Sequence, residues 1–434
     1  MQNTATGVPP LVKDFEEATY GKVTWRLIPF LFICYVFAYL DRINVGFAKL
    51  QMLSDLKFSE SVYGLGAGIF FIGYFLFEVP SNIALHRFGA RKWIARIMIS
   101  WGTISGCMIF VTTPTMFYVL RFFLGVAEAG FFPGIILYLT YWYPSARRAK
   151  ITALFMTGIP IAGLIGGPLS GWILNRFDQL YGMPGWQWLF LIEAIPSIIT
   201  GIIVLFYLND KISDAKWLSP AEKSLLEKNV AAGEKDLESH SVFGAFKNTK
   251  VWVLCACYFG IIMGLYGISF WLPTLIKASG VTDALDIGLL TMIPYGVAAI
   301  AMVLMGRNSD RMFERRWHVA IPAVIGAIGL IVSTLYPQNT ALIVLALTVA
   351  TGGIFSALSQ FWSIPPAFLG GAAAAAGIAL INSVGNLAGF VSTYIVGWIK
   401  DLTQSTDIGL YVIATSLVIA AAIVLTMPKK LVNK

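Results

Sequence analysis

The segment NIALHRFGARK at residues 82–92 is followed 224 positions later by the similar segment GRNSDRMFERR at residues 306–316. A second pair has almost the same spacing, since GWILNRF at 171–177 and GWIKDL at 397–402 lie 226 positions apart. Two independent landmarks with nearly one period indicate that the chain contains two related halves.

The composition indicates that these halves lie in a membrane. Of 434 residues, 57% are hydrophobic and 12% are charged, and the mean hydropathy is +0.74, far outside the range of soluble globular domains. Apolar stretches of roughly 20 residues, long enough to cross a bilayer, occur twelve times. We expect an all-α integral membrane protein with twelve transmembrane helices near 25–48, 61–85, 93–113, 115–140, 150–172, 187–208, 251–276, 285–306, 317–336, 341–363, 371–399 and 408–428.

The basic residues predict the orientation of these helices. If the N-terminus is cytoplasmic, that side carries 24 of the 31 Lys and Arg residues. This asymmetry follows the positive-inside rule and places both termini in the cytoplasm. It also explains the excess positive charge without nucleic-acid binding. The other side carries five basic residues, Lys49, Lys57, Arg176, Lys277 and Lys400.

The same pattern divides the chain into three parts. The N-terminal half is expected at 1–208, with a cytoplasmic segment at 1–24, and the C-terminal half at 251–434. The polar segment 209–250 is the expected cytoplasmic linker. All four cysteines lie in apolar runs, and the spans contain no metal-ligand or nucleophile constellation. We therefore expect no enzyme, no metal and no cofactor, and a monomer in the lipid bilayer.

The two related loops resemble the signature of the major facilitator superfamily, G-x-x-x-D-R-x-G-x-R-R. The second copy keeps Gly306, Asp310 and Arg311, whereas the first has Asn82 and His86 at the glycine and aspartate positions. The first copy, with YLDRINVGFA from Tyr39, RFFLGVAEAGFFPG from Arg121 and SQFWSIPPAFLGG from Ser359, resembles the anion:cation symporter family. Its branch of tartrate, sugar-acid, phthalate and 4-hydroxyphenylacetate permeases implies an organic anion, a proton gradient and a bacterial inner membrane.

Ionisable residues inside the expected spans are candidates for function, because each costs about 2.5–3.5 kcal/mol at a helix centre. Arg121 and Glu128 are seven residues apart, so they share a helix face and are expected to line one cavity. Asp41 and Arg42 are adjacent and point about 100° apart, so only one of them is expected to face the substrate. Six such residues occur, namely Asp41, Arg42, Glu78, Arg121, Glu128 and Glu193.

Arg42 is the expected clamp for a substrate carboxylate, since guanidinium offers a planar fork of donors. The resemblance implies that Asp41 and Glu128 accept protons and that Arg121 couples them to the substrate. The alternative is a fixed charge network that holds the first and fourth spans together.

Two further acidic residues have different expected roles. Glu78 lies toward the Arg87 loop and is expected to act in a cytoplasmic gate. Glu193 is expected to bond a neighbouring helix. The gate is expected to include Arg87, Arg91, Asp310 and Arg311.

Polar and aromatic residues in the spans complete the expected site. The candidates for substrate contact are Tyr39, Tyr74, Tyr258, Gln360, Trp362 and Asn382, with Ser363 and Asn386 as further possibilities. Tyr74 and Asn382 match substrate contacts in the family. Ile159 stands where galactonate carriers have a glutamine, which weakens any assignment of galactonate as the substrate.

Glycines at 163, 167 and 171 predict close packing of the fifth span against a neighbouring helix.

These observations predict secondary active uptake of a small carboxylate with protons, by alternating access between the two halves. They leave open whether the substrate is tartrate, a sugar acid or an aromatic acid. An exporter or exchanger of organic anions is the first alternative, and the glycine pattern of the fifth span is compatible with it. A membrane receptor for an anion is the second, although 42 linker residues leave little room for an effector domain.

Overall fold

The computed structural model describes residues 10–234, 247–369 and 373–433. Within them, twelve helical segments are long and apolar enough to cross a membrane, as predicted. The spans are α1 (Pro10–Ile43) with α2 (Val45–Leu56), α3 (Glu60–Phe88), α4 (Ala90–Gly106) with η1 (Cys107–Phe110), α5 (Pro114–Glu128) with α6 (Phe131–Thr140), α7 (Ser145–Met156) with α8 (Gly158–Arg176), α9 (Gly185–Tyr207), α12 (Thr249–Ala278), α13 (Ala284–Met312), α14 (Arg316–Leu335), α15 (Thr340–Phe361), α17 (Ala373–Thr403) and α18 (Asp407–Thr426). The shorter elements are η2 (Ile212–Asp214), α10 (Pro220–Glu234), α16 (Ile364–Leu369) and α19 (Lys429–Val432).

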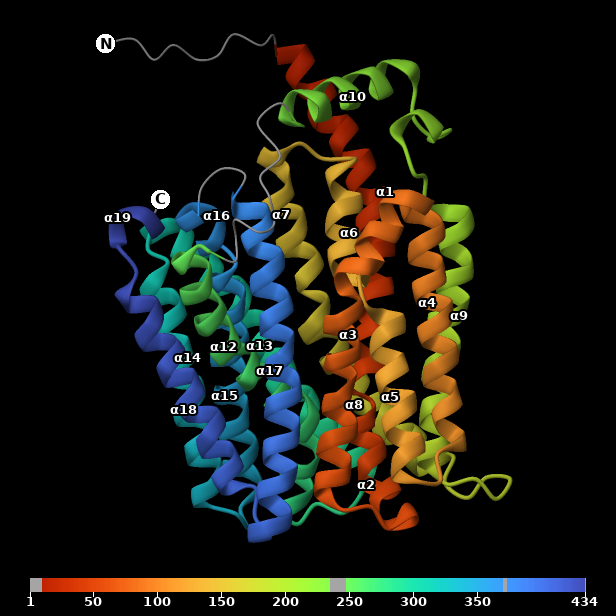
Figure 1. Cartoon of the computed structure of the whole chain (residues 1–434), viewed down its shortest axis with the longest axis vertical. Helices are drawn as coiled ribbons and strands as arrows, with labels where there is room; N and C mark the ends of the chain where they lie inside the picture. The colour runs from red at the N-terminus through yellow and green to blue at the C-terminus, as the bar shows by residue number, and fades with distance from the viewer. Residues whose placement is uncertain (1–9, 235–246, 370–372, 434) are drawn as a thin grey trace.

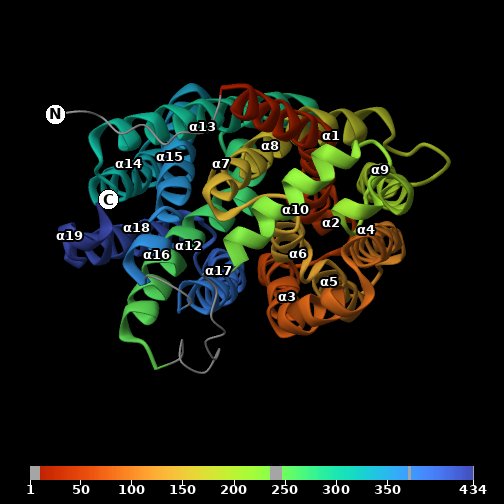
Figure 2. The same cartoon turned by 90° about the horizontal axis from the view of Figure 1, so that it is seen from above.

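The helices form two bundles that lie side by side, α1–α9 in one and α12–α18 in the other (Figure 1 and Figure 2). The start of α1, the linker helix α10, and the short helices α16 and α19 lie at one end of the molecule, which we call the terminal end (Figure 1). The helix α2 and the start of α3 lie at the opposite end.

The terminal end is more helical than the sequence analysis predicts. Helix α1 begins at Pro10, whereas the first span was expected at 25 after a polar segment. The linker contains α10, which begins with a capping box: the Glu222 amide donates to the Ser219 hydroxyl, and the Ser219 amide donates to the Glu222 carboxylate. Lys22 of α1 pairs with Glu222 at 3.1 Å, so the two extra helical segments hold each other in place.

The fourth span is interrupted, although a continuous helix was expected over 115–140. Helix α5 ends at Glu128, and a turn follows in which Ala129 has φ −53° and ψ 132° and Gly130 has φ +83°. A Cβ at Gly130 would lie 2.4 Å from the Ser81 hydroxyl, so both conformation and space require glycine there. The break leaves the Glu128 carboxylate at the C-terminal end of a helix inside the bundle, an arrangement that transporters use at binding sites.

Close helix contacts join the two halves. At Gly167 and Gly171 of α8, a Cβ would lie 2.7 Å from the Gly288 carbonyl oxygen and 2.3 Å from the Ala284 carbonyl oxygen of α13. Helices α3 and α17 form the corresponding contact, where a Cβ at Gly64 would lie 2.7 Å from a carbonyl oxygen. The predicted close packing of the fifth span is confirmed, and its neighbour belongs to the other half.

The halves are joined over only part of their length. Hydrogen bonds between α3 and α17 run from Asp401 at the opposite end to Glu78, about two-thirds of the way along α3. Beyond Glu78, residues 79–88 form no hydrogen bond to the C-terminal half among the described residues. The bundle is therefore held closed at the opposite end and is less tightly joined at the terminal end.

Candidate functional site

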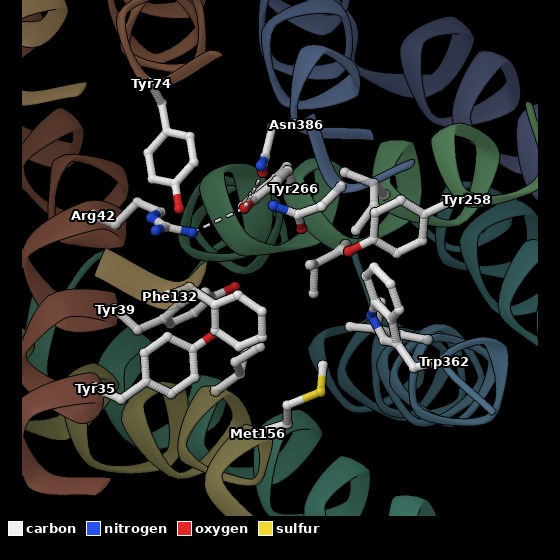
Figure 3. Close-up of a pocket in the computed structure, with 15 residues that line it drawn as sticks. Tyr35, Tyr39, Arg42, Tyr74, Phe132, Met156, Tyr258, Tyr266, Trp362 and Asn386 are labelled. Atoms are coloured by element: carbon white, nitrogen blue, oxygen red, sulfur yellow. Dashed lines mark hydrogen bonds between the residues drawn. The ribbon is translucent and has the colours of Figure 1, made fainter. Parts of the chain in front are cut away.

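Arg42 of α1 connects the two halves at mid-height, and it is 7% exposed. Its Nε donates to Glu128 Oε1 at 3.1 Å, and its Nη2 donates to the same oxygen. Its Nη1 donates to the Tyr266 hydroxyl of α12 at 2.9 Å (Figure 3). One guanidinium thus bonds groups from two other helices, as its fork of donors allows.

A small cavity of about 40 Å³ lies beside this guanidinium, between the halves. Arg42 points into it from one side, whereas Tyr258 and Trp362 lie across the space on the other (Figure 3). In this conformation it has room for a few water molecules, so an organic ligand requires the halves to move apart. Its lining comprises Tyr35, Tyr39, Arg42, Tyr74, Phe132, Met156 and Ile159 from the N-terminal half and Tyr258, Ile262, Leu265, Tyr266, Leu358, Trp362, Asn382 and Asn386 from the C-terminal half.

Asp41, the neighbour of Arg42, points away from this cavity into the N-terminal half. Its carboxylate accepts hydrogen bonds from Trp101 Nε1 at 2.9 Å, from the Ser105 hydroxyl at 3.2 Å and from the Ser197 hydroxyl at 2.5 Å. Of the two adjacent residues, only Arg42 lines the cavity. That only one of them faces the substrate at a time stays a prediction. Because the residues are consecutive on α1, a rotation of this helix moves both of them.

Arg121 is fully buried but does not line the cavity, contrary to expectation. Its Nε and Nη2 donate to the carbonyl oxygens of Gly66 and Ala67 on α3, each at 3.3 Å, and its guanidinium lies 5.2 Å from the Phe70 ring centroid. A shared face with Glu128 did not bring both side chains to one cavity, because close α3–α5 packing directs the long arginine toward α3. Glu128 itself lies behind Arg42 rather than in the lining.

Glu78 and Glu193 have separate environments. The Glu78 carboxylate accepts hydrogen bonds from Asn382 Nδ2 at 2.6 Å and from the Ser383 hydroxyl at 2.8 Å, both across the halves on α17. It does not contact Arg87, which lies in the last turn of the same helix. Glu193 accepts a hydrogen bond from Ser170 of α8 at 2.7 Å, so it bonds a neighbouring helix as expected.

Five of the six expected substrate contacts line the cavity, namely Tyr39, Tyr74, Tyr258, Trp362 and Asn382. Gln360 does not. Its amide donates to the Ser359 hydroxyl and faces Gly306 of α13. Residues two apart on a helix point about 200° apart, so Gln360 and Trp362 at the end of α15 face different neighbours.

The sequence analysis missed Tyr35 and Tyr266 as lining residues, although two signals were available. Tyr35 is seven residues before Arg42, so the two side chains share one face of α1. Tyr266 lies 224 positions after Arg42, which is the period of the internal repeat. The equivalent positions of the two halves thus meet at the cavity through one hydrogen bond.

The expected loops are largely helical, and the gate residues within them lie near helix ends, each in its own half: Arg87 in α3, Arg91 in α4, and Asp310 and Arg311 in α13. The Arg91 amide donates to Asp210 at 2.8 Å, and its side chain lies 3.7 Å from the same carboxylate. Asp310 pairs with Arg315 at 2.6 Å. Arg87 and Arg311 likewise form no contact between the halves among the described residues. A gating role for these residues remains a prediction.

The fold and the central cavity define a membrane transporter built from two six-helix halves. The family model of the Major Facilitator Superfamily matches residues 31–393. The chain therefore belongs to the Major Facilitator Superfamily, and it is a multi-pass membrane transporter rather than an enzyme.

Similar proteins agree with this assignment. The chain is 51% identical over 432 residues to "Putative metabolite transport protein NicT" of Pseudomonas putida, covering 99% of each chain. It is 48% identical to "Putative tartrate transporter" of Agrobacterium vitis, covering 96% of this chain and 93% of that one. A solved bacterial homolog of the human lysosomal transporter Spinster, inward-facing and unoccupied, has a TM-score of 0.73 at 16% identity, covering 96% and 97%.

Proposed function

We propose that this transporter takes up a small organic carboxylate together with protons. The observation that carries the proposal is the Arg42–Glu128 pair beside the cavity, with the guanidinium facing the space and the carboxylate behind it. Arg42 is a suitable donor for a substrate carboxylate, and in the structure its donors are directed at Glu128. Substrate and Glu128 therefore compete for one cation.

This competition supplies a mechanism for proton coupling. If a substrate carboxylate takes the guanidinium, two carboxylates share one cation in a site removed from water. The second negative charge is then destabilised, which favours protonation of Glu128. Binding of an anion and uptake of a proton become parts of one step. Asp41 is the proposed second proton acceptor. It lies on α1 beside Arg42, and its carboxylate accepts three hydrogen bonds. Arg121 of α5, which bonds α3, is the proposed coupling residue.

Alternating access follows from the contacts between the halves. The substrate reaches Arg42 from the N-terminal half and Tyr266 and Asn386 from the C-terminal half, so it can draw the halves together around itself. Glu78 and Asn382 provide a contact on the terminal side of the cavity and are the proposed gate. We propose that the terminal end faces the cytoplasm, in agreement with the positions of the basic residues.

Uptake of labelled organic acids into proteoliposomes with an alkaline interior tests this proposal. Protein-free liposomes correct for passive entry of protonated acids. We expect concentrative uptake that follows the imposed pH gradient and is unchanged when sodium is replaced by potassium. Glu128→Gln should abolish concentrative uptake while exchange between labelled and unlabelled substrate continues. Glu193→Gln, a buried carboxyl in the same half without contact to Arg42, is the matched control. Absence of pH-driven uptake of every acid would refute proton coupling.

A further inference from the structure

We propose that the cavity selects an aromatic monocarboxylate over a dicarboxylate such as tartrate, an inference that rests on the proposed function. The first argument is the count of charges. Arg42 is the one basic residue among the fifteen that line the cavity. A monocarboxylate on Arg42, with Glu128 protonated, leaves the site neutral. A dicarboxylate places a second negative charge in the cavity without a cation to receive it, which is strongly unfavourable in a buried site.

The second argument is the shape and chemistry of the wall opposite Arg42. Tyr258 and Trp362 meet edge to face, with ring centroids 4.9 Å apart, and Phe361 stacks behind Tyr258 at 4.9 Å. Phe361 therefore fixes the orientation of this aromatic pair. Aromatic side chains in such fixed pairs favour another ring by about 0.5–1.5 kcal/mol beyond burial. A flat ring that extends away from its carboxylate places the carboxylate at Arg42 and the ring at Tyr258 and Trp362.

Calorimetric binding to the purified protein tests the assignment with benzoate, cyclohexanecarboxylate and tartrate. Benzoate should bind about 2- to 12-fold more tightly than its saturated analogue, which corresponds to the energy of ring pairing. Tartrate should bind at least about 100-fold more weakly, because its second charge is unpaired. Trp362→Leu and Tyr258→Leu should bring the benzoate to cyclohexanecarboxylate ratio close to one. Trp172→Leu, on the exposed surface of α8, is the control and should leave the ratio unchanged.

The outcomes separate this inference from the function on which it rests. If tartrate binds more tightly than benzoate and accumulates under a pH gradient, the substrate class is wrong and proton-coupled carboxylate uptake stands. If Trp362→Leu and Tyr258→Leu leave the ratio unchanged, the aromatic wall does not select the ring. If no carboxylate binds in a manner that depends on Arg42, the proposed function fails as well.

A separate set of contacts closes the opposite end. Glu60, the first residue of α3, forms salt bridges with Lys49 and with Lys400, each with an N–O distance of 2.6 Å. Lys400 belongs to the C-terminal half. Asp401, the next residue, accepts from the Glu60 amide at 3.0 Å and from the Ser61 amide at 2.8 Å. One half thus caps the first turn of a helix in the other, where a negative charge is favourable.

Two further observations show that Lys49 is buried and that the cluster extends across the interface. Lys49 is 4% exposed, and its Nζ lies 3.6 Å from the centroid of the Trp271 ring of α12. Lys277 of α12 donates to the Leu50 carbonyl oxygen of α2 at 2.9 Å. Three of the five basic residues on this side, namely Lys49, Lys277 and Lys400, therefore belong to the closed interface.

We infer that these residues form an ion-pair lock that must open before substrate enters from the opposite end. Removal of the Lys400–Glu60 pair or of the Asp401 cap should shift the protein toward a state open at that end. The lock also accounts for basic residues on the side that the positive-inside rule depletes.

Distances between spin labels at Lys57 and Gln404, measured by electron paramagnetic resonance after replacement of the native cysteines, test the lock. Lys400→Gln and Asp401→Asn should each increase the long-distance population several-fold. Lys400→Gln should add little in a Glu60→Gln background, because the pair is already lost. Arg176→Gln, a basic residue of the same side outside the cluster, is the control. An unchanged distance distribution in Lys400→Gln and in Asp401→Asn would refute the lock.

Discussion

Replacement of Arg42 by lysine keeps the positive charge but removes the planar set of guanidinium N–H donors. In the structure the guanidinium bonds Glu128 through Nε and Nη2 and Tyr266 through Nη1. A single ammonium cannot reproduce this geometry on two helices, nor can it bind a carboxylate through two parallel bonds. Loss of one bond to a charged group costs about 1.5–3 kcal/mol, which is about a 10- to 150-fold increase in the Kd of the substrate.

Calorimetric binding to the purified Arg42→Lys protein measures this increase, and thermal unfolding shows whether the fold is retained. We expect little change in unfolding, because lysine still neutralises Glu128. Arg42→Ala is the contrasting variant, since it leaves Glu128 buried without a cation and should destabilise the protein by about 3–5 kcal/mol. Adding Glu128→Gln to Arg42→Ala should recover much of that loss. A wild-type Kd in Arg42→Lys would show that the guanidinium donor geometry is not needed for substrate binding.

Three further variants have expected outcomes. Tyr266→Phe removes the acceptor of Arg42 Nη1 and should weaken substrate binding about 3- to 10-fold, measured by calorimetry, from the net value of one hydrogen bond. Gly171→Val places a side chain against the Ala284 carbonyl oxygen and should force the halves apart at the opposite end, which spin-label distances would report. Gln360→Ala should leave the substrate Kd within twofold of wild type, because the side chain lies outside the cavity lining.

The twelve spans were predictable because length and hydropathy alone determine whether a segment can cross a bilayer. The break after Glu128 was not, because Ala129 and Gly130 lie in an apolar run and the conformation depends on contact with Ser81. The opposite orientations of Asp41 and Arg42 followed from helical geometry. Which of them faces the other half depends on how α1 packs, and that is a property of the folded bundle.

For the candidate site, the buried charges were predictable from the sequence, but their partners were not. Arg42 and Glu128 were each recognised as buried charges, but their pairing depends on how the folded bundle brings the end of α5 within reach of the Arg42 side chain. Arg121 was placed at the cavity from its helix face, and the close α3–α5 contact instead turned it toward backbone carbonyl groups. The lock at the opposite end was missed because its parts come from four helices, two in each half, that meet only in the folded bundle.

The central claim is that a substrate carboxylate displaces Glu128 from Arg42 and that Glu128 then takes up a proton. Proton uptake on substrate binding, measured with an indicator dye in weakly buffered detergent solution, tests this claim most directly. The account predicts uptake of a proton with each bound anion in the wild-type protein and less uptake in Glu128→Gln at saturating substrate. Tight binding of the anion to the wild-type protein without any proton uptake would contradict it.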